Sequence, residues 1–340
     1  MLTIAIAPSS ETGKLNVMHL KRYWIKSVLK RTGELKSGDF IEEWHNDITL
    51  LNALGLGLEE TVRYLYLNTP TFEQFEDWIL ETKGGQLNQE KIDQFNGLIS
   101  GETAAVADEP NEENVLTEED HRFWDENGYI IVRNAVEKED CEKAIEALCS
   151  FIGIDRYDAS TWYEDHSAKQ GIMIQLFQHP AIDHNRKTFR VRRAFEEIWN
   201  RKDIWVNTDR VGFNPPETAS YKFQGPRLHW DASIKQPIPF GTQGILYLAD
   251  TAENQGAFTL VPGFHNKIES WMAGLPEGEH PRRQDMYALG PIPIAANAGD
   301  LIIWHKALPH GSSPNTSTLP RFVQYLNYEP ADYKDSDEWI

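Results

Sequence analysis

The chain contains 340 residues, of which 40% are hydrophobic and 11% aromatic, and it carries a formal net charge of −19 at pH 7. These apolar side chains can fill one sizeable core and a second, smaller domain, which excludes a disordered chain. The negative charge argues against nucleic acid as a partner, because a phosphate backbone is bound by a concentrated basic face.

Residues 14–100 are predicted to form an N-terminal all-α domain. The segments 14–36 and 39–54 each place their apolar residues on one helical face. Thr71, with Gln74 three residues later, is a capping-box pattern that predicts the start of a further helix. We expect a bundle of four or five helices in this part of the chain.

The histidines and aromatic residues of this helical domain are interpreted as packing residues. His19 and His45 are assigned to the surface or to helix contacts, and the aromatic side chains to a small core, in preference to a ligand site. The pattern does not specify what the domain does. Docking of a protein, of a carrier-bound substrate or of a second copy of the chain would each use the same kind of surface.

An acidic linker, residues 101–117, is predicted to join this domain to a second one, residues 118–340. Between Gly101 and Asp120 the sequence has eight acidic residues and no basic ones. Such a run is typical of a solvated connection.

The compartment is predicted from the first residues and from the cysteines. The apolar start, residues 1–7, is too short for a secretion signal and lacks its basic flank. No stretch approaches the ~18 consecutive apolar residues of a membrane span, so we expect a cytoplasmic protein without one. Cys141 and Cys149, the only two cysteines, have neither metal-ligand spacing nor a disulfide pattern. They are expected to be buried or half-buried thiols.

The second domain is predicted to be a jelly-roll. Helices are expected at 137–151 and 187–199. Short strands are expected near 204–211, 221–231, 243–249, 257–261, 292–295, 301–304 and 322–328. Repeated short strands separated by turns are typical of a double-sheet, cupin-like core. The chain as a whole is therefore assigned to the α+β class, with flanking helices on a double-stranded β-helix. The long insert 266–290 is either a lid or wall of the substrate pocket, or a surface loop.

The most informative motif is His229-Trp230-Asp231, followed far downstream by His310. In an extended segment the side chains at i and i+2 point to the same side, so His229 and Asp231 converge while Trp230 faces away. Two histidines and one carboxylate are the ligand set of non-haem Fe(II) oxygenases, and they leave positions open on the metal. Alone this pattern is a weak signal, because the chain has 11 histidines and 52 acidic residues.

Arg321, eleven residues after His310, strengthens the metal hypothesis. An arginine grips a carboxylate with two parallel hydrogen bonds. A keto-acid cosubstrate that chelates iron at one end needs such a partner for its far carboxylate. Ser312, two residues after His310, could share that carboxylate.

Four blocks of sequence follow one another in a characteristic order. They are residues 123–132 (FWDENGYIIV), His229-Trp230-Asp231, residues 254–265 (NQGAFTLVPGFH), and the segment 299–321 with GDLIIWH, HGSSPN and PR. Together they resemble the phytanoyl-CoA dioxygenase (PhyH-like) family of Fe(II)- and 2-oxoglutarate-dependent oxygenases. The resemblance extends over roughly residues 118 to 330.

The resemblance implies a role for each matching residue. His229, Asp231 and His310 would ligate Fe(II). Arg321 and Ser312 would hold the distal carboxylate of 2-oxoglutarate, with dioxygen as the third reactant. Tyr247 lies on a strand that lines the interior in this family, so it either contacts the cosubstrate or packs in the core. His265 also falls in a family motif and is interpreted as structural.

The implied reaction is oxidation of a C–H bond in a small-molecule substrate of specialised metabolism, either free or carrier-bound. Related oxygenases that transfer chloride lack the carboxylate ligand, so Asp231 favours hydroxylation, or another oxidation, over halogenation. The net charge of −19 disfavours a coenzyme A thioester unless a basic pocket overrides it. Two alternatives remain: a metal-dependent hydrolase with the same ligands, which leaves Arg321 and Ser312 without a role, and a non-catalytic scaffold that retains the fold.

Overall fold

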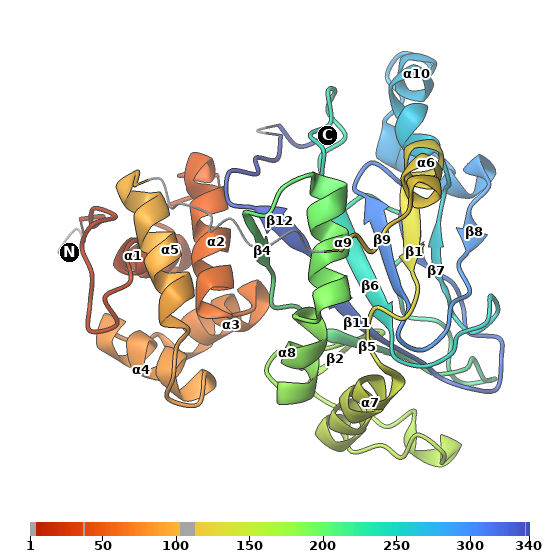
Figure 1. Cartoon of the computed structure of the whole chain (residues 1–340), viewed down its shortest axis with the longest axis horizontal. Helices are drawn as coiled ribbons and strands as arrows, with labels where there is room; N and C mark the ends of the chain where they lie inside the picture. Colours follow the sequence, from red (N-terminus) through yellow and green to blue (C-terminus); the bar gives the residue numbers. More distant parts are fainter. Residues whose placement is uncertain (1–4, 37, 103–112, 337) are drawn as a thin grey trace. The chain divides into compact units, whose positions relative to one another are not determined.

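The computed structural model describes residues 5–36, 38–102, 113–336 and 338–340 (Figure 1). The chain divides into two compact units. The first consists of Met1–Glu112, Lys202–Asp209 and Glu329–Asp337, and the second of Glu113–Arg201, Arg210–Tyr328 and Glu338–Ile340. The two short return segments of the first unit were not predicted from the sequence. The predicted acidic linker, 101–117, lies mostly outside the described residues.

Five α-helices form most of the described part of the first unit, as predicted (Figure 1). They are α1 (Leu20–Thr32), α2 (Trp44–Leu54), α3 (Leu58–Asn68), α4 (Phe72–Thr82) and α5 (Gln89–Ser100), with the 3₁₀ turn η1 (Ile41–Glu43) before α2. The capping box at α4 is confirmed: the Thr71 hydroxyl accepts from the Gln74 amide at 3.3 Å, and the Gln74 side chain accepts from the Thr71 amide at 2.9 Å. Strands β4 (Ile204–Val206) and β12 (Tyr328–Pro330) pair with each other and bring Trp205 to the helical core.

His19 is a helix-packing residue, as predicted. Its side chain is buried, and its Nε2 lies 2.9 Å from an oxygen of Asp47 on α2. The buried Lys26 ammonium donates to the same carboxylate at 2.7 Å. These charges satisfy one another and join α1 to α2, so the cluster is structural.

The second unit contains two antiparallel sheets. The larger one has the strand order β1-β9-β6-β11-β5-β3-β2 and the smaller one β10-β7-β8. Their strands are β1 (Tyr129–Val132), β2 (Lys169–Gln170), β3 (Met173–Ile174), β5 (Val211–Asn214), β6 (Thr242–Tyr247), β7 (Phe258–Leu260), β8 (Ile292–Pro293), β9 (Leu301–His305), β10 (His310–Ser312) and β11 (Arg321–Leu326). The longer helices of this unit are α6 (Glu118–Asn127), α7 (Lys138–Ile152), α8 (Pro180–Arg186), α9 (Phe189–Trp199) and α10 (Ile268–Ala273).

Helices α7, α8 and α9 cover one face of the large sheet. Gln324 on β11 is fully buried on this face, where its amide donates to the Ile182 carbonyl of α8 at 2.8 Å. Phe195 of α9 lies so close to β6 that a Cβ at Gly244 would be 2.9 Å from its ring. The other face of the large sheet is therefore the one available for a core shared with the small sheet.

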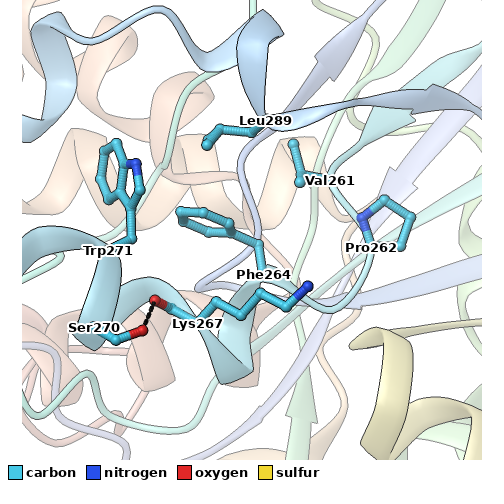
Figure 2. A pocket seen from close by; sticks show the side chains of 7 residues that line it. All are labelled: Val261, Pro262, Phe264, Lys267, Ser270, Trp271 and Leu289. Carbon is cyan, nitrogen blue, oxygen red and sulfur yellow. Dashed lines mark hydrogen bonds between the residues drawn. The ribbon is translucent and has the colours of Figure 1, made fainter. Parts of the chain in front are cut away.

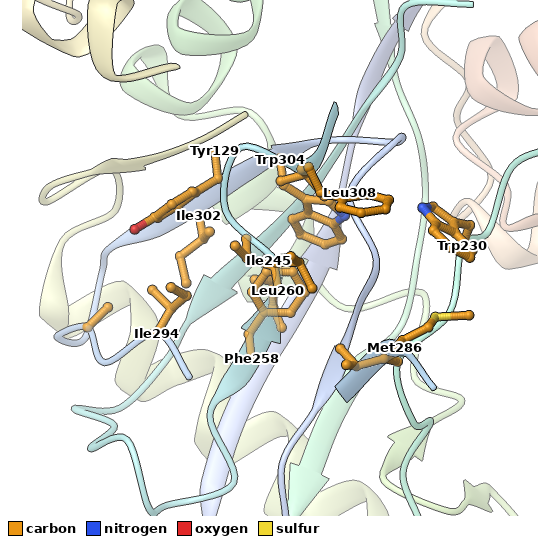
Figure 3. Packing of buried hydrophobic residues seen from close by; sticks show 14 of the residues in the cluster. Tyr129, Trp230, Ile245, Phe258, Leu260, Met286, Ile294, Ile302, Trp304 and Leu308 are labelled. Carbon is orange, nitrogen blue, oxygen red and sulfur yellow. The ribbon is translucent and has the colours of Figure 1, made fainter. Parts of the chain in front are cut away.

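That core is apolar and lies between the two sheets (Figure 3). The large sheet contributes Ile245 of β6 and both Ile302 and Trp304 of β9. The small sheet contributes Phe258 and Leu260 of β7. Cross-strand pairs in register carry their side chains on the same face. The pairing of Gln243 with Trp304 and of Ile245 with Ile302 therefore places Gln243 on this interior face.

The structure differs from the prediction at two of the expected strands. The segment 221–231 forms no strand: it is irregular except for an isolated bridge between His229 and His310. The physical reason is Gly225-Pro226, since proline has no N–H to donate to a ladder and glycine weakens a strand. The predicted strand 204–211 is divided into β4 and the start of β5.

The insert 266–290 packs against the rest of the second unit over part of its length. It contains α10 and the 3₁₀ turns η4 (Pro281–Arg283) and η5 (Met286–Leu289). Met286 belongs to the apolar core, and Trp271 packs against it. No helix in the described part of the chain has the length and apolar character needed to cross a bilayer.

Both cysteines are free and buried on α7, as predicted. Burial raises the pKa of the Cys141 thiol to about 12 and that of Cys149 to about 11. The thiolate is the form that reacts. At pH 8 we therefore expect iodoacetamide to leave both cysteines unmodified in the folded protein and to alkylate both in guanidinium chloride, as measured by mass spectrometry. Rapid alkylation of the folded protein would contradict the buried placement of α7.

Candidate metal centre

The two histidines of the predicted ligand set are held side by side by the backbone. His229 N–H donates to the His310 carbonyl at 2.9 Å, and His310 N–H donates back to the His229 carbonyl at 3.0 Å. The two imidazole rings lie 4.8 Å apart between centroids. This bridge brings together two parts of the chain that are 81 positions apart in the sequence, 310 minus 229.

The same ring nitrogen is used in both histidines. Nδ1 of His229 lies 2.7 Å from the Arg227 carbonyl, and Nδ1 of His310 lies 3.1 Å from the Leu308 carbonyl. A carbonyl can only accept, so each Nδ1 carries the proton and donates it. In the neutral ring Nε2 then presents a lone pair, which is the state of a metal-binding histidine oriented by a backbone partner.

Asp231 faces both lone pairs. Its Oδ1 lies 3.0 Å from Nε2 of His229, and its Oδ2 lies 3.2 Å from Nε2 of His310. One ligand atom from each of the three residues fits within 4.8 Å of the other two. The side chain of His310 is 5% exposed, whereas those of His229 and Asp231 are 34% and 48% exposed. The cluster is therefore buried on one side and open on the other.

The electrostatics of the cluster favour a cation at its centre. Burial alone would raise the pKa of Asp231, but the hydrogen bonds with His229 and His310 hold it well below its usual range. Burial alone would lower the pKa of His229, but the hydrogen bond with Asp231 raises it above its ordinary value. Two lone pairs and a carboxylate that face one another need a positive charge, either a proton or a metal ion.

Arg321 lies fully buried at the start of β11. Its Nη1 donates to the Ser312 hydroxyl at 3.1 Å, which places these two predicted residues together. Its Nε and Nη2 are buried and have no hydrogen-bond partner within the described structure. A buried charge without a counter-ion is costly. The two unpartnered N–H groups therefore suit an anionic group with two oxygens.

Tyr247 lies in the interior of the same unit with its hydroxyl already bonded. The hydroxyl donates to the Ile294 carbonyl at 2.8 Å and accepts from the Phe258 amide at 2.8 Å. Burial raises the pKa of this phenol to about 12. Both partners are backbone groups, one on β7 and one just after β8. This agrees with the alternative in which Tyr247 packs in the core. A cosubstrate contact of Tyr247 stays a prediction.

His265 lies outside the metal-ligand cluster. Its Nε2 is 3.2 Å from the Asp125 carbonyl, and a Cβ at Gly128 would lie 2.5 Å from its Nδ1. Gly128 has a φ of 72°, in the left-handed region that glycine favours. These contacts place His265 against the end of α6, in agreement with its structural interpretation.

Arg282 supports the irregular segment that carries Asp231, and sequence reasoning missed this role. Its guanidinium donates to the carbonyls of Trp230 at 2.8 Å and Ala232 at 2.5 Å, and to a backbone oxygen of Ile340 at 2.8 Å. These carbonyls have no strand partner, so the arginine takes the place of a neighbouring strand. The sequence placed Arg282 only within the insert, because no spacing rule connects residues fifty positions apart.

A surface hollow of about 340 Å³ lies beside α10 (Figure 2). It is lined by Val261, Pro262, Phe264, Lys267, Ser270, Trp271 and Leu289. The Trp230 ring lies 6.2 Å from the rings of both Phe264 and Trp271. None of the six predicted site residues lines this hollow.

A model of the family described as phytanoyl-CoA dioxygenase (PhyH) matches residues 124–323. The chain belongs to the phytanoyl-CoA dioxygenase family. The matched range contains all six predicted site residues of the chain. The family resemblance predicted from the four sequence blocks is thereby confirmed.

Relatives from other organisms match the same part of the chain. A putative phytanoyl-CoA dioxygenase of Dictyostelium discoideum is 24% identical over 267 residues, covering 64% of this chain and 76% of the relative. The human peroxisomal phytanoyl-CoA dioxygenase is 23% identical over 241 residues, covering 64% and 70%. The crystal structure of GlcNAc Inducible Gene 2 from Candida albicans aligns with a TM-score of 0.51 at 14% identity, over 64% of each chain. This last likeness concerns the fold alone.

Replacing Arg282 tests its support of the Asp231 segment. In Arg282→Met the carbonyls of Trp230 and Ala232 lose their donor, so we expect the free energy of unfolding to fall by about 2 kcal/mol, as measured by urea denaturation. Arg283→Met is the matched control, because Arg283 is exposed and adjacent. Equal stability of the two variants would contradict the supporting role of Arg282.

Proposed function

We propose that this chain is an Fe(II)- and 2-oxoglutarate-dependent oxygenase that hydroxylates, or otherwise oxidises, a C–H bond of a small-molecule substrate. The observation that carries the proposal is the convergence of His229, Asp231 and His310 on one point, within 4.8 Å, on the open side of the unit. Membership of a dioxygenase family supports it.

The residues present suit ferrous iron. Nε2 of His229, Nε2 of His310 and one oxygen of Asp231 would hold the ion. Two imidazoles and one carboxylate are the facial ligand set of non-haem Fe(II) oxygenases. When bound, iron with dioxygen and 2-oxoglutarate supplies the oxidising chemistry, and 2-oxoglutarate is converted to succinate and carbon dioxide. The chain itself orients the ligands: the Arg227 and Leu308 carbonyls hold both Nε2 atoms toward the site.

Arg321 and Ser312 would bind the distal carboxylate of 2-oxoglutarate. The two unpartnered N–H groups of Arg321 match the two oxygens of a carboxylate. The Ser312 hydroxyl already accepts from Nη1, so its own proton is available to a bound anion. Because Ser312 and His310 share the short strand β10, the carboxylate site and the metal site have a fixed spacing.

Asp231 favours hydroxylation over halogenation within this class. A carboxylate in the ligand set occupies the position that chloride takes in the related halogenases. The large sheet and the small sheet, which share one apolar core, support the jelly-roll arrangement proposed for the catalytic unit. We further propose that the protein acts in the cytoplasm in specialised metabolism, and that its helical unit docks a protein or a carrier-bound substrate.

A hydrolase with the same three ligands is less well supported. A hydrolytic reaction gives the buried, partly unpartnered Arg321 no function. A scaffold without catalytic activity is also less well supported, since nothing would then offset the cost of keeping a buried guanidinium without a counter-ion.

Replacing the Asp231 carboxylate tests whether the cluster binds a metal ion. We expect Asp231→Ala to weaken the binding of Mn(II), used in place of Fe(II), by at least about 100-fold, the upper range for loss of a group that orients a metal ligand. Isothermal titration calorimetry under argon measures the dissociation constant. Glu253→Ala, which removes an exposed carboxylate from the same unit, serves as the control. The metal assignment fails if Asp231→Ala binds Mn(II) as tightly as the control.

The carboxylate site is tested by Arg321→Met. Removal of a buried, unpaired charge should leave the unfolding temperature of the metal-free protein unchanged or raised. Wild-type protein with Mn(II) should be stabilised further by 2-oxoglutarate, because a ligand that binds only the folded state shifts unfolding by mass action. The variant should bind Mn(II) normally and lose this second shift. An undiminished shift in Arg321→Met would show that the carboxylate binds elsewhere.

A further inference from the structure

Gln243 of β6 contacts the predicted metal ligand Asp231 directly. Its Nε2 donates to Oδ2 of the carboxylate at 2.6 Å. Oδ2 is also the oxygen that lies 3.2 Å from Nε2 of His310, whereas Oδ1 lies 3.0 Å from Nε2 of His229. The two oxygens of Asp231 therefore have different surroundings, and only Oδ2 has an amide partner.

The position of Gln243 is set by the sheet and not by the loop that carries Asp231. β6 lies between β9 and β11 in the large sheet, and Gln243 pairs with Trp304 of β9. Ile245, two residues later on the same face, belongs to the apolar core. A side chain on an interior strand is held more rigidly than one on an irregular segment, so Gln243 can act as a fixed reference for the carboxylate.

The number of carboxylate oxygens on the metal decides how many positions remain open. A facial set with one oxygen from Asp231 leaves three of six positions, enough for a bidentate keto acid and dioxygen. A bidentate carboxylate would occupy one of them. The geometry points to Gln243 as a positioning residue that binds Oδ2 of Asp231, so that only Oδ1 would be available to a metal ion. This inference rests on the proposed function.

A second observation separates this role from ordinary packing. Oε1 of Gln243 is buried and has no hydrogen-bond partner within the described structure, as is also true of Nε1 of Trp304. A buried polar atom without a partner costs stability. An apolar residue would therefore suit the strand at least as well. The amide at position 243 is explained by its bond to Asp231 and not by the sheet.

The test compares two variants with a matched control. Gln243→Met keeps the length of the side chain and removes the amide. Gln243→Asn keeps an amide that is one methylene too short to reach Asp231. Gln94→Met makes the same replacement on α5 of the first unit, where the Gln94 side chain hydrogen-bonds to Glu90 and Lys91. Each protein is titrated with Mn(II) by calorimetry and with Co(II) by visible absorption, and its metal-free form is melted.

We expect both Gln243 variants to bind Mn(II) about 10- to 100-fold more weakly than wild type, the usual effect of losing a group that orients a metal ligand. The Co(II) bands should shift, because a second carboxylate oxygen would then occupy one of the open positions on the ion. The melting temperature of metal-free Gln243→Met should equal or exceed that of wild type, whereas a packing role would lower it. Gln94→Met should match wild type throughout.

Three results would overturn the inference, and they can be distinguished from one another. If wild type and Gln243→Met bind Mn(II) equally and give the same Co(II) spectrum, Gln243 does not position Asp231 and the proposed function stands. If wild type itself binds neither ion, the proposed function fails and the role of Gln243 fails with it. A lowered melting temperature with unchanged metal binding would assign Gln243 to the sheet alone.

Discussion

The site depends on one constraint: the imidazoles of His229 and His310 and the carboxylate of Asp231 point their lone pairs at one another. Because the Nδ1 protons of His229 and His310 are donated to backbone carbonyls, both Nε2 lone pairs face the carboxylate of Asp231 at 3.0 and 3.2 Å. Such an arrangement repels itself unless a cation lies within it. The backbone bridge between His229 and His310 holds the two histidines side by side.

The candidate site residues lie on two kinds of backbone in the second unit: regular strands and one irregular segment. The two sheets and their apolar core carry His310, Ser312, Arg321 and Gln243 on regular strands. The segment with His229 and Asp231 has almost no strand pairing of its own, and the carbonyls on either side of Asp231 depend on Arg282. Of the three candidate ligands, the more exposed His229 and Asp231 lie on the irregular segment, and the buried His310 lies on β10.

The parts of the site that could be predicted from the sequence are those in which the residues lie a few positions apart or directly follow a recognisable strand. The i, i+2 relation of His229 and Asp231, and the appearance of His310 and Arg321 after an apolar strand, are visible in one dimension. The bond from Gln243 to Asp231 spans twelve positions and that from Arg282 to Ala232 fifty, so both appear only when the chain is folded. The unpredicted return segments, 202–209 and 329–337, have the same origin. Local propensity does not record which distant segment supplies a partner.

The central claim is that one metal ion binds between these three ligands, with an anion beside Arg321. A crystal grown anaerobically with Mn(II) and 2-oxoglutarate measures both at once, because anomalous scattering locates manganese directly. The account predicts a single strong anomalous peak bonded to Nε2 of His229, Nε2 of His310 and one oxygen of Asp231, with the distal carboxylate of 2-oxoglutarate on Nε and Nη2 of Arg321. A peak elsewhere, or an empty site at saturating Mn(II), would contradict it.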